Sequence, residues 1–153
     1  MTPPSPHSVA VFSLDDRPFA LDVAKIKQVV RAVEIAPLPE APLGVRGVID
    51  VRGRIVPVFD LRVRFGLPSR AVRVSDFLVL AHTGRRDVAL LVDGVVGVVP
   101  ANEAQITAPA EFLPELRGLE GVTTIAGDIV LIHDLDRFLS AEEDEALADA
   151  LRK

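Results

Sequence analysis

The side chains that could do chemistry are few in this sequence. It contains three histidines and no cysteine, so thiolate catalysis, disulfide bonds and cysteine-based metal sites are excluded. His7 lies near the start, His82 beside a predicted turn and His133 in a predicted strand. No H-x-x-x-H spacing brings two imidazoles together. The sequence therefore predicts neither a metal ion nor a cofactor.

The remaining candidate for a hydrolytic or small-ligand site is the group His133, Asp134 and Asp136. Such a barrel would need the three side chains to converge in a pocket, but strand alternation places His133 and Asp134 on opposite faces. Asp134 at a strand end is sufficiently explained as a cap of the next turn. Asp93-Gly94 is favoured as a plain turn over an aspartic-protease loop. We expect a protein that is not an enzyme, with this ligand-binding or hydrolytic barrel as the alternative.

Composition limits the partners. Of the 153 residues, 49% are apolar and 25% charged, which is enough for a hydrophobic core. The net charge is −5, and there is no Trp or Tyr to stack on bases, which argues against nucleic acid as a partner. Apolar runs such as Val88 to Val92 are far shorter than the roughly 20 residues of a membrane helix. We expect a protein inside the cell that does not insert into a membrane.

The chain contains an internal repeat. Residues 47–65 align without a gap over residues 121–139 at an offset of 74, with seven of 19 positions identical. Each copy predicts a first hairpin, from strands 9–14 and 19–23 or 77–81 and 88–92, and a second hairpin. The second hairpins join strands 48–51 and 55–59, and strands 122–125 and 129–133, with a glycine in each turn. A repeat of short strands indicates two similar β structures.

The predicted fold is all-β in the main, with two small five-stranded SH3-like β-barrels packed together and a C-terminal helix. We expect a disordered leader over 1–8, a first barrel over 9–75, a second barrel over 76–139 and a helix over 140–153. The run from Ser140 to Glu143 fits a capping box, and Leu147 and Leu151 are expected to face a barrel. Residues 24–34 fit either a short helix or a bent strand.

The two copies differ in charge at the second hairpin. The first has Arg46, Arg52, Arg54, Arg62 and Arg64, where the second has Glu120, Ala126, Asp128, Asp136 and Phe138. A turn arginine such as Arg52 suits planar recognition of a carboxylate or of backbone carbonyls. Equally, these arginines could be solubilising charges, with Arg54 paired to Asp50. The sequence physics leaves both interpretations open.

The stretch GVIDVRGRIVPVFDLRVRFGL resembles the signature of the CheW family of bacterial chemotaxis coupling proteins. The resemblance extends from VFSLDDRPFALDVAKIKQVV through LVDGVVGVV to GDIVLIHDLDRFL. The same domain occurs in the kinase CheA and in CheV, but no ATP-binding, phosphotransfer or receiver segment fits this length. The resemblance is therefore to the stand-alone coupling protein.

The resemblance implies a non-enzymatic adaptor that joins the cytoplasmic helical hairpin of chemoreceptors to the CheW-like regulatory domain of CheA. It implies a cytoplasmic protein, associated with the membrane only through receptor arrays. A CheW-like adaptor of a non-flagellar motility pathway is the alternative within the family. Positions matching the family's receptor-binding groove are Arg52, Gly47, Val23, Ile26, Gln28, Ala89, Val95 and Val98. Gln28, where an acid is frequent, and Ala89, often glycine, are departures that bear on receptor choice.

Overall fold

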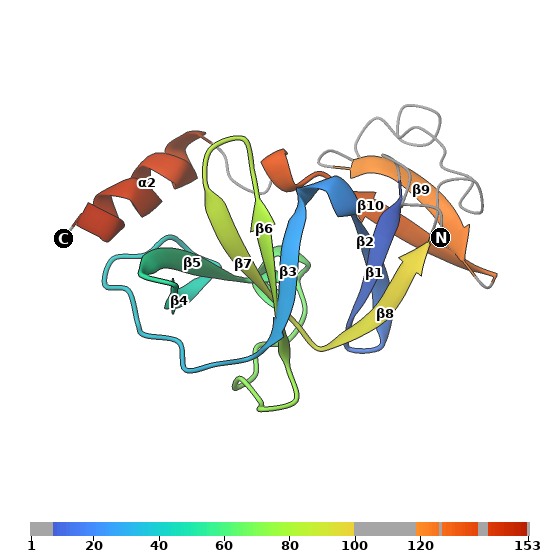
Figure 1. Cartoon of the computed structure of the whole chain (residues 1–153), viewed down its shortest axis with the longest axis horizontal. Coiled ribbons are helices and arrows are strands. Elements are labelled where there is room, and N and C mark those ends of the chain that lie inside the picture. Colours follow the sequence, from blue (N-terminus) through green and yellow to red (C-terminus); the bar gives the residue numbers. More distant parts are fainter. Residues whose placement is uncertain (1–7, 100–118, 126, 138–140, 153) are drawn as a thin grey trace.

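The computed structural model describes residues 8–99, 119–125, 127–137 and 141–152. The described chain forms strands, short helical turns and a C-terminal helix (Figure 1). The strands are β1 (Val9–Leu14), β2 (Arg17–Asp22), β3 (Ile26–Arg31), β4 (Val45–Val51), β5 (Arg54–Asp60), β6 (Phe77–His82), β7 (Asp87–Val92), β8 (Gly94–Val99), β9 (Leu119–Ile125) and β10 (Asp128–His133). The helical segments are η1 (Val23–Lys25), α1 (Leu61–Arg64), η3 (Leu135–Arg137) and α2 (Ala141–Arg152).

The strands form two five-stranded sheets. Sheet A has the order β8-β1-β2-β10-β9, and sheet B has the order β3-β6-β7-β5-β4. This confirms the mainly β fold with a C-terminal helix. Among the described residues each sheet stays open, with β8 and β9 or β3 and β4 at its edges, so the expected barrels are not fully closed. A single bridge between Ala36 and Val48 ties the chain after β3 to β4.

The two copies of the repeat exchange their first hairpins. Strands β1 to β5 correspond in sequence order to β6 to β10, yet β1 pairs with β8 and β2 with β10. In the same way β6 pairs with β3 and β7 with β5. The sheets therefore do not follow the expected boundary between residues 75 and 76. Alternation of apolar residues specifies which face is buried but not which copy supplies the neighbouring strand.

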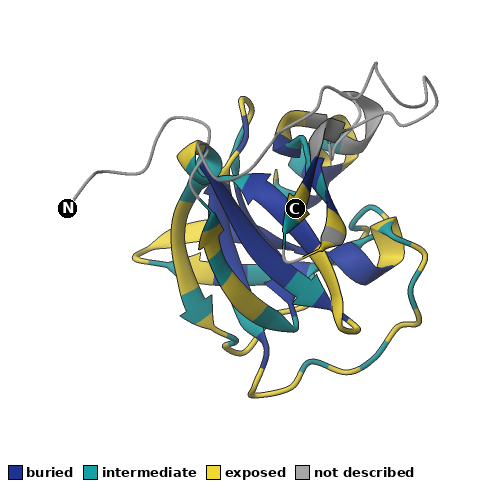
Figure 2. Cartoon of the chain, turned by 90° about the vertical axis from the view of Figure 1, so that its right-hand side faces the viewer, coloured by how far each residue is buried: buried dark blue, intermediate teal, exposed yellow. Residues whose placement is uncertain are grey.

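The exchanged hairpins are buried on both faces. Phe12 and Leu90 point into a central cluster between the sheets. Their neighbours Val11 and Leu91 point into smaller clusters that belong to sheet A and sheet B respectively. Burial on two sides explains why these strands read as almost continuous apolar runs. Figure 2 shows the buried stretches on the inner strands, with exposed positions on the outer strands and loops.

Of the two structures predicted for residues 24–34, a short helix or a strand, the strand is the one observed. Val23–Lys25 form one turn of 3-10 helix, and β3 then pairs with β6 at the edge of sheet B. The apolar residues with helical spacing share no buried face, because Val29 is 37% and Val33 53% exposed. A 3-10 turn capped by Asp22, whose carboxylate accepts from the Ala24 N–H at 2.9 Å, leads the chain into the strand.

The chain ends add two findings. Ser8 is fully buried, and its carbonyl accepts a hydrogen bond from the Val23 N–H at 3.0 Å. The expected leader is therefore wrong at residue 8, and residues 1–7 lie outside the described chain. Leu147 of α2 is fully buried in the central cluster with Leu151 packed against it, as predicted, while Ser140 of the predicted capping box lies outside the described residues. No helix in the described part is long and apolar enough to cross a membrane.

Candidate functional site

Two arginines that are found only in the first copy of the repeat, Arg46 and Arg62, form contacts within the fold. The Arg62 side chain is 5% exposed and forms ion pairs with Asp15 at 2.7 Å and Asp93 at 2.6 Å. Arg46 donates to the Arg70 carbonyl at 2.6 Å and faces the buried Asp60 at 3.6 Å. Both side chains therefore make contacts within the fold, Arg62 as a buried group and Arg46 as a 28% exposed one.

Arg52 is available for a partner. The turn between β4 and β5 has Arg52 at φ 53° and Gly53 at φ 84°, the two positive angles that a tight type I′ hairpin requires. A non-glycine residue in this region is held at a cost of roughly 1 kcal/mol, and such positions are often functional. Asp50 accepts from the Gly53 N–H at 2.7 Å, so it closes the turn and does not pair with Arg54. Arg52 is exposed and makes no hydrogen bond or ion pair with the residues that the structure describes.

Arg52 lies at the rim of a cleft of about 290 Å³ in sheet B. The floor is apolar, made by Val51, Val56, Leu80, Ala81 and Val88. The rim is polar, made by Lys27, Gln28, Arg52, Arg54 and Asp87. An apolar floor with charged residues at its edge is the arrangement that accepts one face of an amphipathic segment.

The single carboxylate of this rim is already occupied. Asp87 binds Lys27 Nζ at 2.9 Å and His82 Nδ1 at 2.7 Å, with Arg54 at 3.6 Å. Hydrogen bonds from Lys27 and then from His82 lower the pKa of the Asp87 carboxyl. With Lys27, Arg52 and Arg54 against the single carboxylate of Asp87, the rim is positive, which favours a hydrogen-bond acceptor from a partner.

The structure brings only part of the predicted receptor site together. Gln28 and Arg52 line the same cleft. Val23 and Ile26 are half-buried and pack against the central cluster where the chain enters β3. The two predicted residues of sheet A, Val95 and Val98 on edge strand β8, are 46% and 56% exposed.

Gly47 and Ala89 lie inside the fold. A Cβ on Gly47 would lie 2.2 Å from the carbonyl oxygen of Ala36, so this position is glycine because the bridging chain passes over it. Ala89 is fully buried in sheet B. Both residues support the sheet that carries the cleft, and neither offers a side chain to a partner.

Sequence reasoning missed three residues of these surfaces. Lys27 and Asp87 line the cleft, but they belong to β3 and β7 and meet only through the pairing of both strands with β6. Val96 is 63% exposed on β8, more than its predicted neighbours. The alternation along an edge strand could have indicated Val96, whereas nothing local indicates the pairing of Lys27 with Asp87.

Comparison with known proteins decides the family. The family model of the CheW-like domain matches residues 8–143. The chain belongs to the CheW family. The chain is 30% identical over 131 residues to the chemotaxis protein CheW of Thermotoga maritima, covering 86% of each protein. It is 28% identical over 145 residues to that of Klebsiella aerogenes, covering 94% of this chain and 87% of the relative.

A solved structure agrees with this membership. The scaffolding protein TtCheW from Thermoanaerobacter tengcongensis superimposes with a TM-score of 0.78 and 28% identity, covering 90% of this chain and 95% of that one. The resemblance read from the hairpin motif is thereby confirmed. Because CheW proteins are a scaffolding family, the prediction of a non-enzymatic protein is confirmed as well.

The alternative catalytic group does not converge in this CheW-like fold. The His133 ring stacks on Phe65 with centroids 4.6 Å apart, and burial lowers its pKa to about 4. Asp134 caps the next turn by accepting from the Asp136 N–H at 3.0 Å. Asp136 binds Lys25 Nζ at 2.7 Å and the Gly84 N–H at 2.6 Å. The described residues contain no cluster of three or more His, Asp or Glu that could hold a metal ion.

Proposed function

We propose that this protein is a non-enzymatic chemotaxis adaptor that couples the cytoplasmic helical hairpin of chemoreceptors to the histidine kinase CheA. The observation that carries the proposal is the unpaired Arg52 guanidinium at the rim of an apolar cleft. Membership of the CheW family supports it. The protein would act in the cytoplasm, held at the membrane only through its receptors, without a cofactor or nucleic acid.

The cleft suits one face of a receptor helix. An apolar side chain of the helix would cover Val51, Val56 and Leu80 on the floor. The Arg52 guanidinium has five donors in a fixed plane, and it would bind a carboxylate or exposed carbonyls of the helix. Asp87 does not compete for Arg52, because Lys27 and His82 already bind it.

A second contact area lies on edge strand β8. Val95 and Val98 are exposed there although both are β-branched apolar residues. Exposed apolar side chains on an edge strand are a hazard unless a partner covers them. We include Val95 and Val98 in the receptor-binding surface, with Val96 added because it is the most exposed of the three.

The kinase side of the proposal rests on family membership. The proposed partner is the CheW-like regulatory domain of CheA, which has the same fold class as this chain. We assign no kinase-contact residues.

Co-sedimentation tests the coupling. Receptor cytoplasmic fragments are attached to lipid vesicles, CheA from the same organism is added, and the vesicles are pelleted with and without this protein. The proposal predicts that CheA pellets strongly only when the protein is present, and that this recruitment is lost with Arg52→Ala. Pelleting of CheA that does not depend on the protein would contradict the coupling function.

A further inference from the structure

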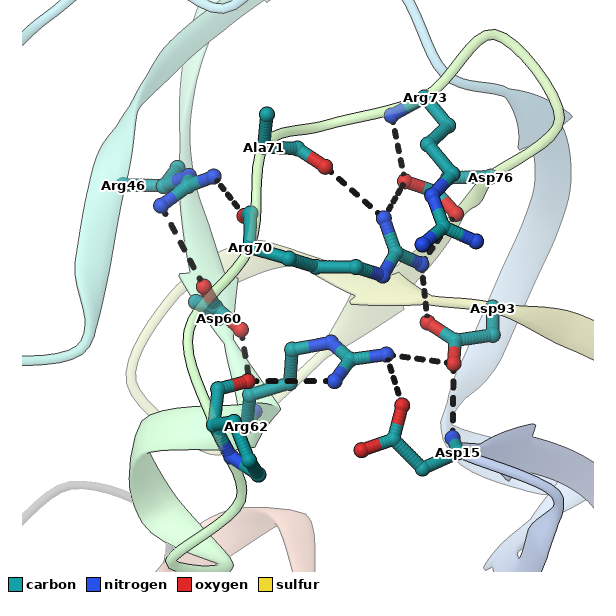
Figure 3. Close-up of polar contacts among 10 residues, drawn as sticks. Asp15, Arg46, Asp60, Arg62, Arg70, Ala71, Arg73, Asp76 and Asp93 are labelled. Carbon is teal, nitrogen blue, oxygen red and sulfur yellow. Dashed lines mark hydrogen bonds and ion pairs between the residues drawn. The ribbon is translucent and has the colours of Figure 1, made fainter.

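Asp93 is the only residue between β7 of sheet B and β8 of sheet A. Its N–H donates to the Ser13 carbonyl of β1 at 3.0 Å. Its carboxylate accepts from Arg62 at 2.6 Å, from Arg70 at 2.5 Å and from the Asp15 N–H at 2.7 Å (Figure 3). The carboxylate at this crossover therefore has three donors from separate parts of the chain.

These donors come from both sides of the molecule. Arg62 lies in α1, directly after β5 of sheet B, and also binds Asp15 in the β1–β2 turn of sheet A. Arg70 is held in turn by both carboxylate oxygens of Asp76, at 2.7 and 2.9 Å, just before β6. In Figure 3 the carboxylate of Asp93 lies between the two guanidinium groups.

Much of this ion-pair network is shielded from solvent. The side chains of Arg62 and Asp76 are 5% and 2% exposed, and that of Arg70 is 18% exposed. Burial alone would raise the pKa of Asp93, but hydrogen bonds from Asp15 and Arg62 outweigh it and lower this pKa. Removing one partner from a network of this kind leaves charges uncompensated.

We infer that Asp93, Arg62 and Arg70 are positioning residues that fix the orientation of sheet A on sheet B. Apolar packing between the sheets is non-directional, whereas charge-assisted hydrogen bonds hold a defined geometry. The orientation sets where the β8 valines lie relative to the Arg52 cleft. This inference goes beyond the proposed function, and only its consequence for binding depends on that function.

A distance measurement between the sheets tests the inference directly. The chain has no cysteine, so Ile55→Cys on β5 and Ile129→Cys on β10 give two unique spin-label sites. These residues are 58% and 72% exposed and are equivalent positions of the repeat. Electron–electron double resonance is then recorded for the labelled protein and for its Asp93→Asn, Arg62→Met and Asp16→Asn variants.

We expect Asp93→Asn and Arg62→Met to broaden or shift the distance distribution relative to that of the labelled protein without these substitutions. Asp16→Asn is the matched control, because Asp16 lies in the same turn as Asp15 but outside the network, and its distribution should be unchanged. A folded Asp93→Asn protein with an unaltered distribution overturns the inference. If Asp93→Asn does not fold, Asp15→Asn decides, since Asp15 is 40% exposed, and an unaltered distribution there also overturns it.

Binding of the receptor fragment separates this inference from the proposed function. Asp93→Asn should weaken binding by at least about threefold, whereas Arg52→Ala should lose binding with an unaltered distance distribution. A changed distribution with undiminished binding in both variants would support the positioning role and contradict the proposed function. Loss of binding in Arg52→Ala, with unaltered distance distributions in all variants, would support the proposed function and contradict the positioning role.

Discussion

Gly47 illustrates how a family motif can be structural at one residue and functional at another. It stands five residues before Arg52 in the same hairpin. Its backbone has φ 153°, and the chain at Ala36 passes directly above it. A substitution that abolishes receptor binding at Gly47 would therefore report on folding, whereas one at Arg52 would report on contact.

The first prediction compares Gly47→Ala with Gly97→Ala. Gly97 has the same φ of 153° but nothing within 4 Å of its Cβ position. We expect Gly97→Ala to cost about 1 kcal/mol of unfolding free energy from backbone strain, and Gly47→Ala more than about 3 kcal/mol from strain plus collision. Urea unfolding measures both. Equal losses would show that the contact with Ala36 is unimportant.

The second prediction concerns His133. Burial lowers its pKa from 6.5 to about 4, so between these values the unfolded chain binds a proton that the folded chain does not. Stability should therefore fall as the pH falls through this window, by about 2 to 3 kcal/mol. Carboxylates with lowered pKa values, such as Asp93, stabilise the folded protein at neutral pH, and this stabilisation is lost only as the pH falls from about 5 through the unfolded-state value and below it.

His133→Phe should remove this loss, because Phe59 fills the equivalent position in the other copy of the repeat. Urea unfolding at a series of pH values between about 7 and 4.5 provides the measurement. A variant that still loses stability as steeply as the parent would rule out His133 as the cause.

At the scale of elements, α2 is attached to the sheets by one main anchor. Leu147 is fully buried in the central cluster, Leu151 packs against it, and Asp144 pairs with Arg86 at 2.8 Å. The helix lies beside sheet B at the end of the molecule away from β8 and β9 (Figure 1). Its stability in the fold therefore depends more on burial than on charge.

The third prediction follows from this anchor. Leu147→Ala should lower the unfolding free energy by about 2 to 4 kcal/mol, because it removes a fully buried side chain and leaves a cavity. Leu151→Ala, at a partly buried position of the same helix, should cost less than half as much. Urea unfolding of both variants tests this, and similar losses at the two positions would contradict the assignment of Leu147 as the anchor.

At the scale of the whole molecule, the sequence predicted the hairpin strands and the repeat, but not the edge strand β8, the choice of strand over helix at β3, or how the copies combine. Both hairpins of each copy and the C-terminal helix lie where the apolar patterns and turn glycines place them. The sequence did not predict that the β1–β2 and β6–β7 hairpins exchange between the two sheets. Each of these hairpins is apolar on both faces, so the pattern fits either partner.

Contacts between residues distant in the chain also limit how much of the site the sequence predicts. Arg52 is recognisable from a local motif because a tight turn exposes whatever side chain it carries. The neighbouring arginines look alike in sequence, yet Arg62 is buried against Asp15 and Asp93, which are distant in the chain. Only the three-dimensional structure separates the buried arginine from the available one.

We propose above all that the free guanidinium of Arg52 binds the receptor. Isothermal titration with a receptor cytoplasmic fragment compares the parent protein, Arg52→Ala and Arg85→Ala, an exposed arginine in the β6–β7 turn. We expect Arg52→Ala to raise Kd at least about tenfold with an unchanged melting temperature, and Arg85→Ala to bind as the parent does. A folded Arg52→Ala protein with the parent's affinity would contradict the account.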